Sequence, residues 1–159
     1  MNEKFCYADT DSLSLFPSLA VYPLSIKVRY RDNSYKVERH GDWIDLAVSE
    51  DYELKAGEFK LLDLGIAIQL PAGYEALLVP RSSTFKKFGV IQANSIGIID
   101  NSYCGKEDWW KMAVIATRNV IIPKGTRLCQ FRLLRNQPTF AIIEAELSDN
   151  NRGGFGTTG

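Results

Sequence analysis

Short segments in which apolar and polar residues alternate recur along this chain, and they limit the folds that it can adopt. In residues 24–30 an apolar side chain stands at every second position, and the basic residues Lys27, Arg29 and Arg31 fill the alternate positions. A period of two places the apolar side chains on one face of a β-strand. Comparable apolar, strand-like patterns occur at residues 62–70, 75–79, 112–116 and 141–147.

Turn residues separate these segments, for example P-A-G at 71–73 and P-K-G at 123–125. Helical periodicity is confined to residues 83–88, with Ser82 or Ser83 as the N-cap. Many short strands at close spacing are typical of a sandwich, a jelly roll or a barrel. The sequence therefore predicts an all-β fold with one short helix.

The composition narrows the classes of function. Lysine plus arginine and aspartate plus glutamate both number 19, so no net positive charge favours nucleic acid as the partner. We expect a small phosphorylated ligand instead, and no membrane, because no apolar stretch approaches the roughly 20 residues of a membrane span. Three cysteines without a C-x-x-C pair favour the cytoplasm. The single histidine, His40, argues against a zinc site or a Ser-His-Asp triad.

The ends of the chain differ in composition from the middle. Residues 7–12 (Y-A-D-T-D-S) and 11–18 (D-S-L-S-L-F-P-S) resemble two motifs of family B DNA polymerases. Here the two overlap and share Asp11, whereas a polymerase carries them far apart in a much longer chain. We interpret residues 1–23 as an N-terminal extension, 24–148 as one β domain, and the glycine-rich residues 149–159 as a C-terminal lid.

Two inner segments concentrate groups suited to phosphate or water chemistry. P-R-S-S at 80–83 combines an arginine with two hydroxyls at a helix start, where backbone N–H groups bind anions. Asp100 follows an apolar run and precedes turn residues, a setting in which a carboxylate can orient and deprotonate a water. Each also has a structural interpretation in isolation: a surface arginine at a turn, and an aspartate that caps a hairpin.

Two later segments add polar groups. Arg127 and Gln130 are polar members of a predicted strand, where Arg127 is expected to tie that strand to its neighbour. In R-G-G-F-G-T-T-G at 152–159, glycines permit close backbone approach, Arg152 and the threonines suit phosphate, and Phe155 suits a base face. The alternative for this last segment is a solvated polar tail.

These four segments, with G-D-W-I-D-L at 41–46, occur in the order and approximate spacing of the five motifs of trimeric dUTPases. The chain resembles that family over roughly residues 24–159. The resemblance implies a jelly-roll-like dUTPase fold with one short helix and a flexible C-terminal arm. It also implies a homotrimer with active sites shared between subunits, dUTP as substrate, and Mg²⁺ on the triphosphate.

The resemblance further implies roles for single residues. Asp100 would be the general base for the attacking water, Tyr103 would pack under the deoxyribose, and Asp45 would contact the metal through water. The hairpin leading into Asp100 would read uracil through backbone groups, and the tail would close over the substrate. The expected substrate-binding residues are Arg81, Ser82, Ser83, Asn94, Gly97, Ile99, Tyr103, Gln130, Arg152, Phe155, Gly156, Thr157 and Thr158.

Several features depart from the family pattern or leave alternatives open. Ser83 stands where glycine is common, Thr126 where an acidic residue is common, and residues 106–110 form a longer segment with two tryptophans of unassigned role. A dCTP deaminase is the enzymatic alternative, but it needs a glutamate in the strand after Gly105, and residues 111–115 contain no carboxylate. A nucleotide-sensing partner of a regulatory protein is the non-enzymatic alternative.

Overall fold

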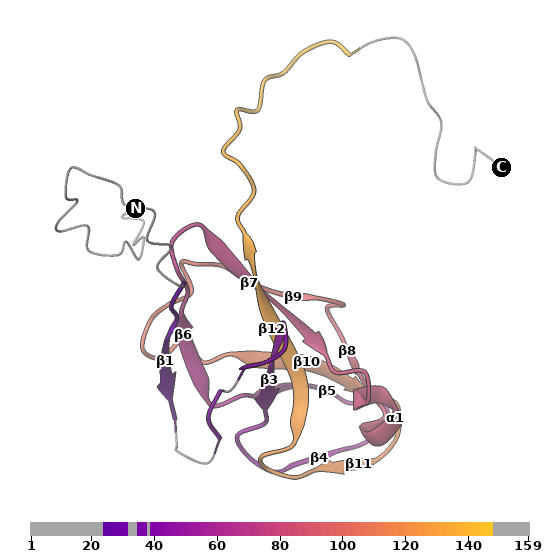
Figure 1. The fold of residues 1–159 in the computed structure, drawn as a ribbon. Coiled ribbons are helices and arrows are strands. Elements are labelled where there is room, and N and C mark those ends of the chain that lie inside the picture. Colours follow the sequence, from indigo (N-terminus) through magenta and orange to yellow (C-terminus); the bar gives the residue numbers. More distant parts are fainter. Residues whose placement is uncertain (1–23, 32–34, 38, 148–159) are drawn as a thin grey trace.

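The computed structural model describes residues 24–31, 35–37 and 39–147, and nearly all of its regular structure is antiparallel strand (Figure 1). The predicted N-terminal extension and C-terminal lid lie outside these residues, so the domain division at both ends stays a prediction. Among the residues described, none of the helical structure is long and apolar enough to cross a membrane.

Within the described ranges the strands form four sheets, and one five-residue helix, α1 (Thr84–Phe88), lies between β7 and β8. The largest sheet has the order β2-β3-β12-β7-β9, a second has the order β5-β10-β8, and β1-β6 and β11-β4 form pairs. The strand bounds are β1 Lys27–Tyr30, β2 Arg39–His40, β3 Trp43–Ala47, β4 Tyr52–Leu54, β5 Phe59–Asp63, β6 Ile66–Gln69, β7 Tyr74–Pro80, β8 Val90–Gln92, β9 Gly97–Ile99, β10 Lys111–Ala116, β11 Val120–Ile122 and β12 Arg127–Arg135. The predicted jelly-roll-like all-β class is confirmed.

The core lies between the sheets, where inward-facing residues of β3, β6, β7, β10 and β12 pack together. Its two largest fully buried side chains, Trp110 and Phe131, form an edge-to-face pair with ring centroids 5.1 Å apart. Such a pair adds about 0.5–1.5 kcal/mol to the stability that burial of the rings provides. Cys129 is fully buried beside them in β12, and this burial raises the pKa of its thiol well above the ordinary range.

Residues 62–70 form two strands where the pattern predicts one. Gly65 adopts a φ of +65°, which breaks the strand, and a Cβ there would meet the Cβ of Ser49 at 2.8 Å. As a result β5 joins the β10-β8 sheet, while β6 pairs with β1. The alternating pattern misses this break because residues 62–68 are buried on both sides.

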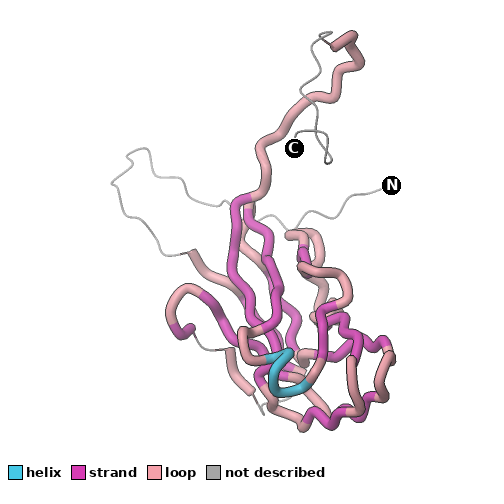
Figure 2. The backbone as a smooth tube through the Cα atoms, turned by 90° about the vertical axis from the view of Figure 1, so that its right-hand side faces the viewer, coloured by secondary structure: helices cyan, strands magenta, loops and turns pink. Residues whose placement is uncertain are grey.

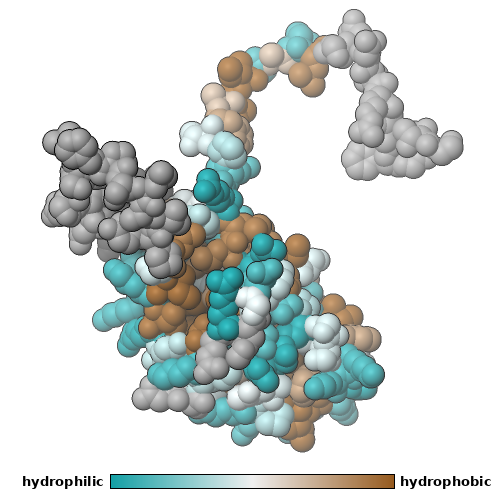
Figure 3. Space-filling model, in the orientation of Figure 1, coloured by the Kyte–Doolittle hydropathy of each residue, from teal (hydrophilic) through white to brown (hydrophobic). Residues whose placement is uncertain are grey.

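Residues 136–147 run away from the body of the protein as an extended arm without a strand partner (Figures 1 and 2). Figure 3 shows apolar residues along this arm, and Ile142 is 91% exposed and Leu147 88% exposed. The strand predicted at 141–147 is therefore wrong within a single chain. A strand requires hydrogen-bonding partners for its backbone, and the described part of this chain presents none to the arm.

Candidate active site

Asp45, Arg81 and Arg127 form an arginine cluster where β3, β12 and β7 lie side by side. One carboxylate oxygen of Asp45 lies 3.0 Å from Arg81 Nε, and the other lies 3.4 Å from Arg127 Nη1. The strand register places Gln130 of β12 between Asp45 and Val79. The side chain of Asp45 is only 14% exposed, whereas Arg127 is 48% exposed. The cluster therefore holds two guanidinium groups at the surface around one shielded carboxylate. The ion pair of Arg127 with Asp45 also connects β12 to β3, in agreement with the expectation that Arg127 ties its strand to a neighbour.

The turn between β7 and α1 positions the P-R-S-S hydroxyls beside this cluster. The Arg81 N–H and the Thr84 hydroxyl both donate to the carbonyl of Leu128, at 3.2 and 2.5 Å, and this fixes the turn on β12. The helix is confirmed, with Ser83 at the N-cap position, but the Ser83 side chain makes no capping hydrogen bond. Arg81 and the exposed Ser82 line a surface pocket of about 370 Å³ with Pro80, Phe85, Val90, Ile91 and Gln92.

Asp100 occupies a different pocket, at the end of β9. Its Oδ1 accepts hydrogen bonds from the backbone N–H of Ser102, at 2.7 Å, and from the Ser102 hydroxyl. The bonds from the Ser102 hydroxyl and N–H hold the pKa of the Asp100 carboxyl below its ordinary value. The carboxylate is thus exposed, charged and locally fixed, which are properties that a base for a water molecule needs.

Tyr103 lies three residues beyond Asp100 and lines the same pocket. Its side chain is 43% exposed, and its hydroxyl donates to the carbonyl of Trp109 at 3.4 Å. Partial burial raises the pKa of the Tyr103 hydroxyl. The carboxylate pocket has a volume of about 610 Å³ and is lined by Leu61, Ile98, Ile99, Asp100, Ser102, Tyr103, Trp109, Trp110 and Lys111.

The segment leading into Asp100 brings Gly97 and Ile99 to the edge of the large sheet through β9, while the exposed Asn94 stays in the preceding turn. A Cβ at Gly97 would meet Leu78 Cβ at 3.1 Å, so the close approach of β9 to β7 favours glycine there. The expected hairpin is not a simple two-stranded unit, because β8 pairs with β10 and β9 pairs with β7. Backbone groups of the turn hold it together instead, such as Ser95 N–H donating to Gln92.

The arginine cluster and the carboxylate pocket lie at opposite ends of β7. Ile99 pairs with Ala76, which places Asp100 level with Glu75, whereas Arg81 directly follows Pro80 at the other end. Six residues of strand correspond to about 20 Å. One chain therefore does not bring the predicted base and the predicted phosphate-binding residues together. Arg152, Phe155, Gly156, Thr157 and Thr158 lie outside the described residues.

Two residues that form hydrogen bonds with the predicted base and tyrosine were not among the predicted site residues. Ser102 is the hydrogen-bond donor to Asp100, and the D-N-S turn sequence was the available signal for it. Trp109 lines the pocket, and its carbonyl accepts a hydrogen bond from the Tyr103 hydroxyl. Its half-buried position was not predictable, because residues 106–110 show neither a strand nor a helix pattern of apolar residues.

The oxygen, nitrogen and sulfur groups of the described side chains fit a metal ion that is contacted through water and not by direct coordination. The described residues contain no group of three or more His, Cys, Asp or Glu side chains that could hold a metal ion. Asp45 is the carboxylate beside the phosphate-binding candidates, and both of its oxygens face arginines. Mg²⁺ commonly keeps several waters and is bound through one or two carboxylates together with substrate phosphates, which suits this arrangement.

Comparisons with known proteins support the fold and identify a family. The sequence profile of the dUTPase family matches residues 42–159. The SPbeta prophage-derived deoxyuridine 5'-triphosphate nucleotidohydrolase YosS of Bacillus subtilis is 50% identical over 141 residues, covering 86% of this chain and 99% of that protein. A deoxyuridine 5'-triphosphate nucleotidohydrolase of Hydrogenobaculum is 42% identical over 103 residues, covering 62% of this chain and 69% of that protein.

Solved structures match as well. The crystal structure of dUTPase from Streptococcus mutans superposes with a TM-score of 0.62 at 25% identity, covering 76% of this chain and 98% of that one. A mutant of the Staphylococcus bacteriophage 80alpha dUTPase with dUpNHpp has a TM-score of 0.70 at 19% identity, covering 85% and 98%, and supports the fold alone. The family profile covers well over half of the chain, and the Bacillus relative is similar over nearly its whole length. The chain therefore belongs to the dUTPase family.

Proposed function

We propose that this protein is a dUTP diphosphatase that hydrolyses dUTP to dUMP and pyrophosphate by attack of a water on the α-phosphorus. The observation that carries the proposal is the presence of two complementary half-sites on one fold. The carboxylate pocket offers a fixed base beside a tyrosine, and the arginine cluster offers cations and hydroxyls for a triphosphate. Phosphoryl chemistry needs this combination of charge neutralisation and positioning.

In the carboxylate pocket, Asp100 takes the proton of the attacking water. Its lowered pKa keeps the carboxylate charged, and the bonds from Ser102 occupy one oxygen while the other remains for water. Tyr103 packs under the deoxyribose and excludes a 2′-hydroxyl. The backbone of the segment with Asn94, Gly97 and Ile99 reads the uracil edge.

At the arginine cluster, Ser82, Ser83 and Gln130 contact phosphate oxygens, and Arg81 supports them. The absence of a capping bond on Ser83 is consistent with a hydroxyl that is available to a ligand. Mg²⁺, when bound with the triphosphate, neutralises phosphate charge, and Asp45 contacts it through water. The dUTPase from phage phi11 of S. aureus is described with a structural Mg(II) ion, which supports a divalent ion in this fold.

A second copy of the chain completes each site, in a homotrimer. The separation of about 20 Å between the half-sites supports this. Phe59, Ile115 and Ile91 form an exposed apolar row across the β5-β10-β8 sheet, and their exposed fractions are 57, 40 and 50%. Such a contiguous exposed apolar row marks an interaction surface. This sheet also contributes Leu61 to the carboxylate pocket and Ile91 to the pocket of Arg81, so a neighbour packed here can bring unlike half-sites together.

The exposed arm supports the same assembly. Residues 136–147, which precede the fifth motif in the sequence, leave the body of their own chain. In the proposed trimer the arm reaches a neighbour, where Arg152, Thr157 and Thr158 bind outer phosphates and Phe155 stacks on uracil, next to Gly156. We further propose that the enzyme acts in the cytoplasm, without nucleic acid or membrane as a partner.

Turnover of dUTP and dCTP, followed by phosphorus NMR, tests the proposal. We expect dUMP and pyrophosphate from dUTP, and no deamination of dCTP, because Asp100 is the one carboxylate among the described residues that line its pocket. A deaminase would convert dCTP with its triphosphate intact. A pure nucleotide sensor would bind dUTP without turnover, and either result would contradict the proposal.

A further inference from the structure

Trp109 connects the carboxylate pocket to strand β1. Its ring faces Arg29 of that strand and Arg31, which directly follows it, with the Cζ of Arg31 4.5 Å and the Cζ of Arg29 5.1 Å from the ring centroid. Its indole N–H donates to Glu107 at 3.0 Å, and the other oxygen of Glu107 accepts from Arg29 at 2.7 Å. Trp109 is therefore held on its face by two cations and at its edge by a carboxylate that one of those cations also binds.

This clamp is itself fixed to the body of the protein. Arg31 pairs with Asp63 at 2.8 Å, and the Asp63 side chain is 10% exposed. The other oxygen of Asp63 accepts from the Ser49 hydroxyl at 3.0 Å and from the Gly65 N–H at 2.7 Å. Arg31, the arginine nearer the ring, is thus ion-paired with Asp63, whose carboxylate is shielded and hydrogen-bonded. This pairing restricts the movement of Arg31.

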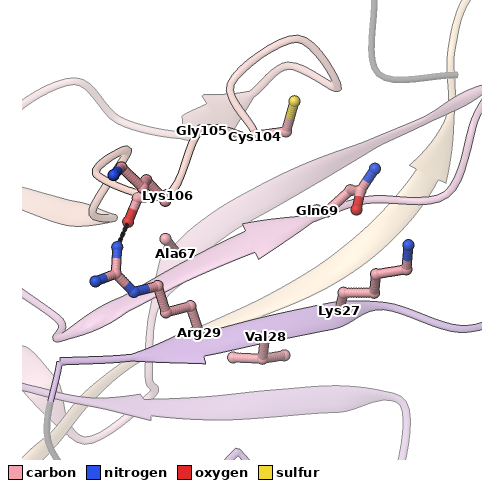
Figure 4. A pocket seen from close by; sticks show the side chains of 8 residues that line it. All are labelled: Lys27, Val28, Arg29, Ala67, Gln69, Cys104, Gly105 and Lys106. Carbon is pink, nitrogen blue, oxygen red and sulfur yellow. Dashed lines mark hydrogen bonds between the residues drawn. The ribbon is translucent and has the colours of Figure 1, made fainter.

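A second attachment holds the backbone of the same segment. Figure 4 shows Arg29 reaching from β1 to the carbonyl of Lys106, across the groove between β1 and the loop that carries Gly105. The turn that follows is tight, because the Gly105 N–H donates to the Asp108 carboxylate at 2.6 Å. These contacts set where the backbone of residues 105–109 lies relative to the sheet.

The backbone carbonyl of Trp109 contacts Tyr103, the proposed sugar-binding residue. Trp109 and Tyr103 both line the carboxylate pocket, and the Trp109 carbonyl accepts the hydrogen bond from the Tyr103 hydroxyl. Among the described residues, the Tyr103 hydroxyl makes no other hydrogen bond. A displacement of Trp109 would therefore be passed directly to the hydroxyl end of Tyr103.

We propose that Trp109 is a positioning residue that fixes Tyr103 through the clamp of Arg29, Arg31 and Glu107, and thereby sets discrimination between dUTP and UTP. The inference rests on the proposed function, because it assigns to Tyr103 the exclusion of the 2′-hydroxyl. Trp109 need not touch the substrate in this role. It keeps the wall of the sugar pocket where a ribonucleotide cannot be accommodated.

The test compares kcat/KM for dUTP and UTP in trimeric Trp109→Ala and Trp109→Phe. We expect Trp109→Ala to raise the UTP/dUTP ratio by on the order of tenfold, the size of effect that loss of a cation–π clamp allows. Trp109→Phe retains an aromatic face for the arginines and should keep most of the discrimination. An unchanged ratio in Trp109→Ala, or an equal defect in Trp109→Phe, would overturn the inference.

Two further variants keep the test decisive. Glu107→Ala alters a 64% exposed side chain, so it should fold even if Trp109→Ala does not, and it should relax the ratio in the same direction. Trp43→Ala is the matched control: Trp43 also lies under an arginine, with Arg132 Cζ 5.5 Å from the ring, but outside the carboxylate pocket. Its UTP/dUTP ratio should equal that of the wild type, and no relaxation in Glu107→Ala would contradict the clamp.

Tyr103→Ala separates this inference from the proposed function. If Trp109 acts through Tyr103, adding Trp109→Ala to Tyr103→Ala should not change the UTP/dUTP ratio further. A relaxed ratio in Tyr103→Ala with an unchanged ratio in Trp109→Ala overturns the role of Trp109 alone. An unchanged ratio in Tyr103→Ala overturns the steric role of Tyr103 in the proposed function.

Discussion

The two half-sites hold their functional carboxylates by different means. Asp45 is 14% exposed and paired with arginines on other segments, one of them 82 residues away in sequence. Asp100 is exposed and held by Ser102, two residues away. Long-range pairing makes the arginine cluster part of the sheet, whereas the Asp100 turn is a local unit. Substitutions at Asp45 should therefore disturb several binding groups together, and substitutions at Asp100 should disturb the chemical step alone.

The largest expected effect is that of Asp100→Asn. Asparagine keeps the shape of the turn but cannot take a proton, so kcat should fall by about 10²–10⁴-fold with binding of dUTP retained. Stopped-flow binding and steady-state turnover measure the two quantities. Near-normal turnover would remove Asp100 from the mechanism and with it the proposed contrast between the half-sites.

Mixed assemblies test whether the half-sites meet between chains. Asp100→Asn and Arg81→Ala chains should each be nearly inactive alone. When the two variants are refolded together in equal amounts, we expect about a quarter of the wild-type activity. Half of the chains carry an intact Asp100 and the other half an intact Arg81, so about one interface in four combines the two intact half-sites. Recovery that stays at the level of the separate variants would mean that each site is built within one chain.

A smaller effect is expected from Asp45→Asn. Loss of the carboxylate releases both arginines of the cluster and the water-mediated metal contact, so KM for dUTP and the Mg²⁺ requirement should rise. Charge-assisted hydrogen bonds of about 1.5–3 kcal/mol correspond to roughly ten- to a hundredfold in KM. Asp42→Asn is the matched control, because this 83% exposed carboxylate lies 3.8 Å from Arg39 and outside the cluster. An equal change in both variants would contradict a special role for Asp45.

The smallest expected effect is a shift in pH dependence. Ser102 lowers the pKa of Asp100, so the active, deprotonated form persists to lower pH. Ser102→Ala removes the hydroxyl donor and keeps the backbone bond, and the pKa should rise. Activity is lost as pH falls through this pKa, so the acid limb of kcat/KM should move to higher pH in the variant. A limb that stays in place would show that another group controls it.

The sequence predicted most of this architecture where local patterns and global packing agree. The alternation around Val28 and Tyr30, the turn at 71–73 and the short helix are all confirmed, and the family follows from the motif order. The break at Gly65 was not predictable, because a strand buried on both faces shows no alternation. Residues 141–147 have a strand-like pattern but find no strand partner among the residues that the structure describes. The clamp on Trp109 depends on arginines about 80 residues away, and no local pattern reports such contacts.

The reactivity of Cys129 reports how often β12, the central strand of the largest sheet, separates from its neighbours. The thiol is completely shielded, and its burial holds it in the unreactive protonated form. Alkylation of this position therefore requires β12 to separate from β3 or β7, and the labelling rate measures the population of that opened state. A ligand that binds only the closed form must slow the labelling in proportion to its occupancy. Mass spectrometry of the peptide that contains Cys129 would thus read out nucleotide binding at Gln130, the next residue along, without any measurement of catalysis.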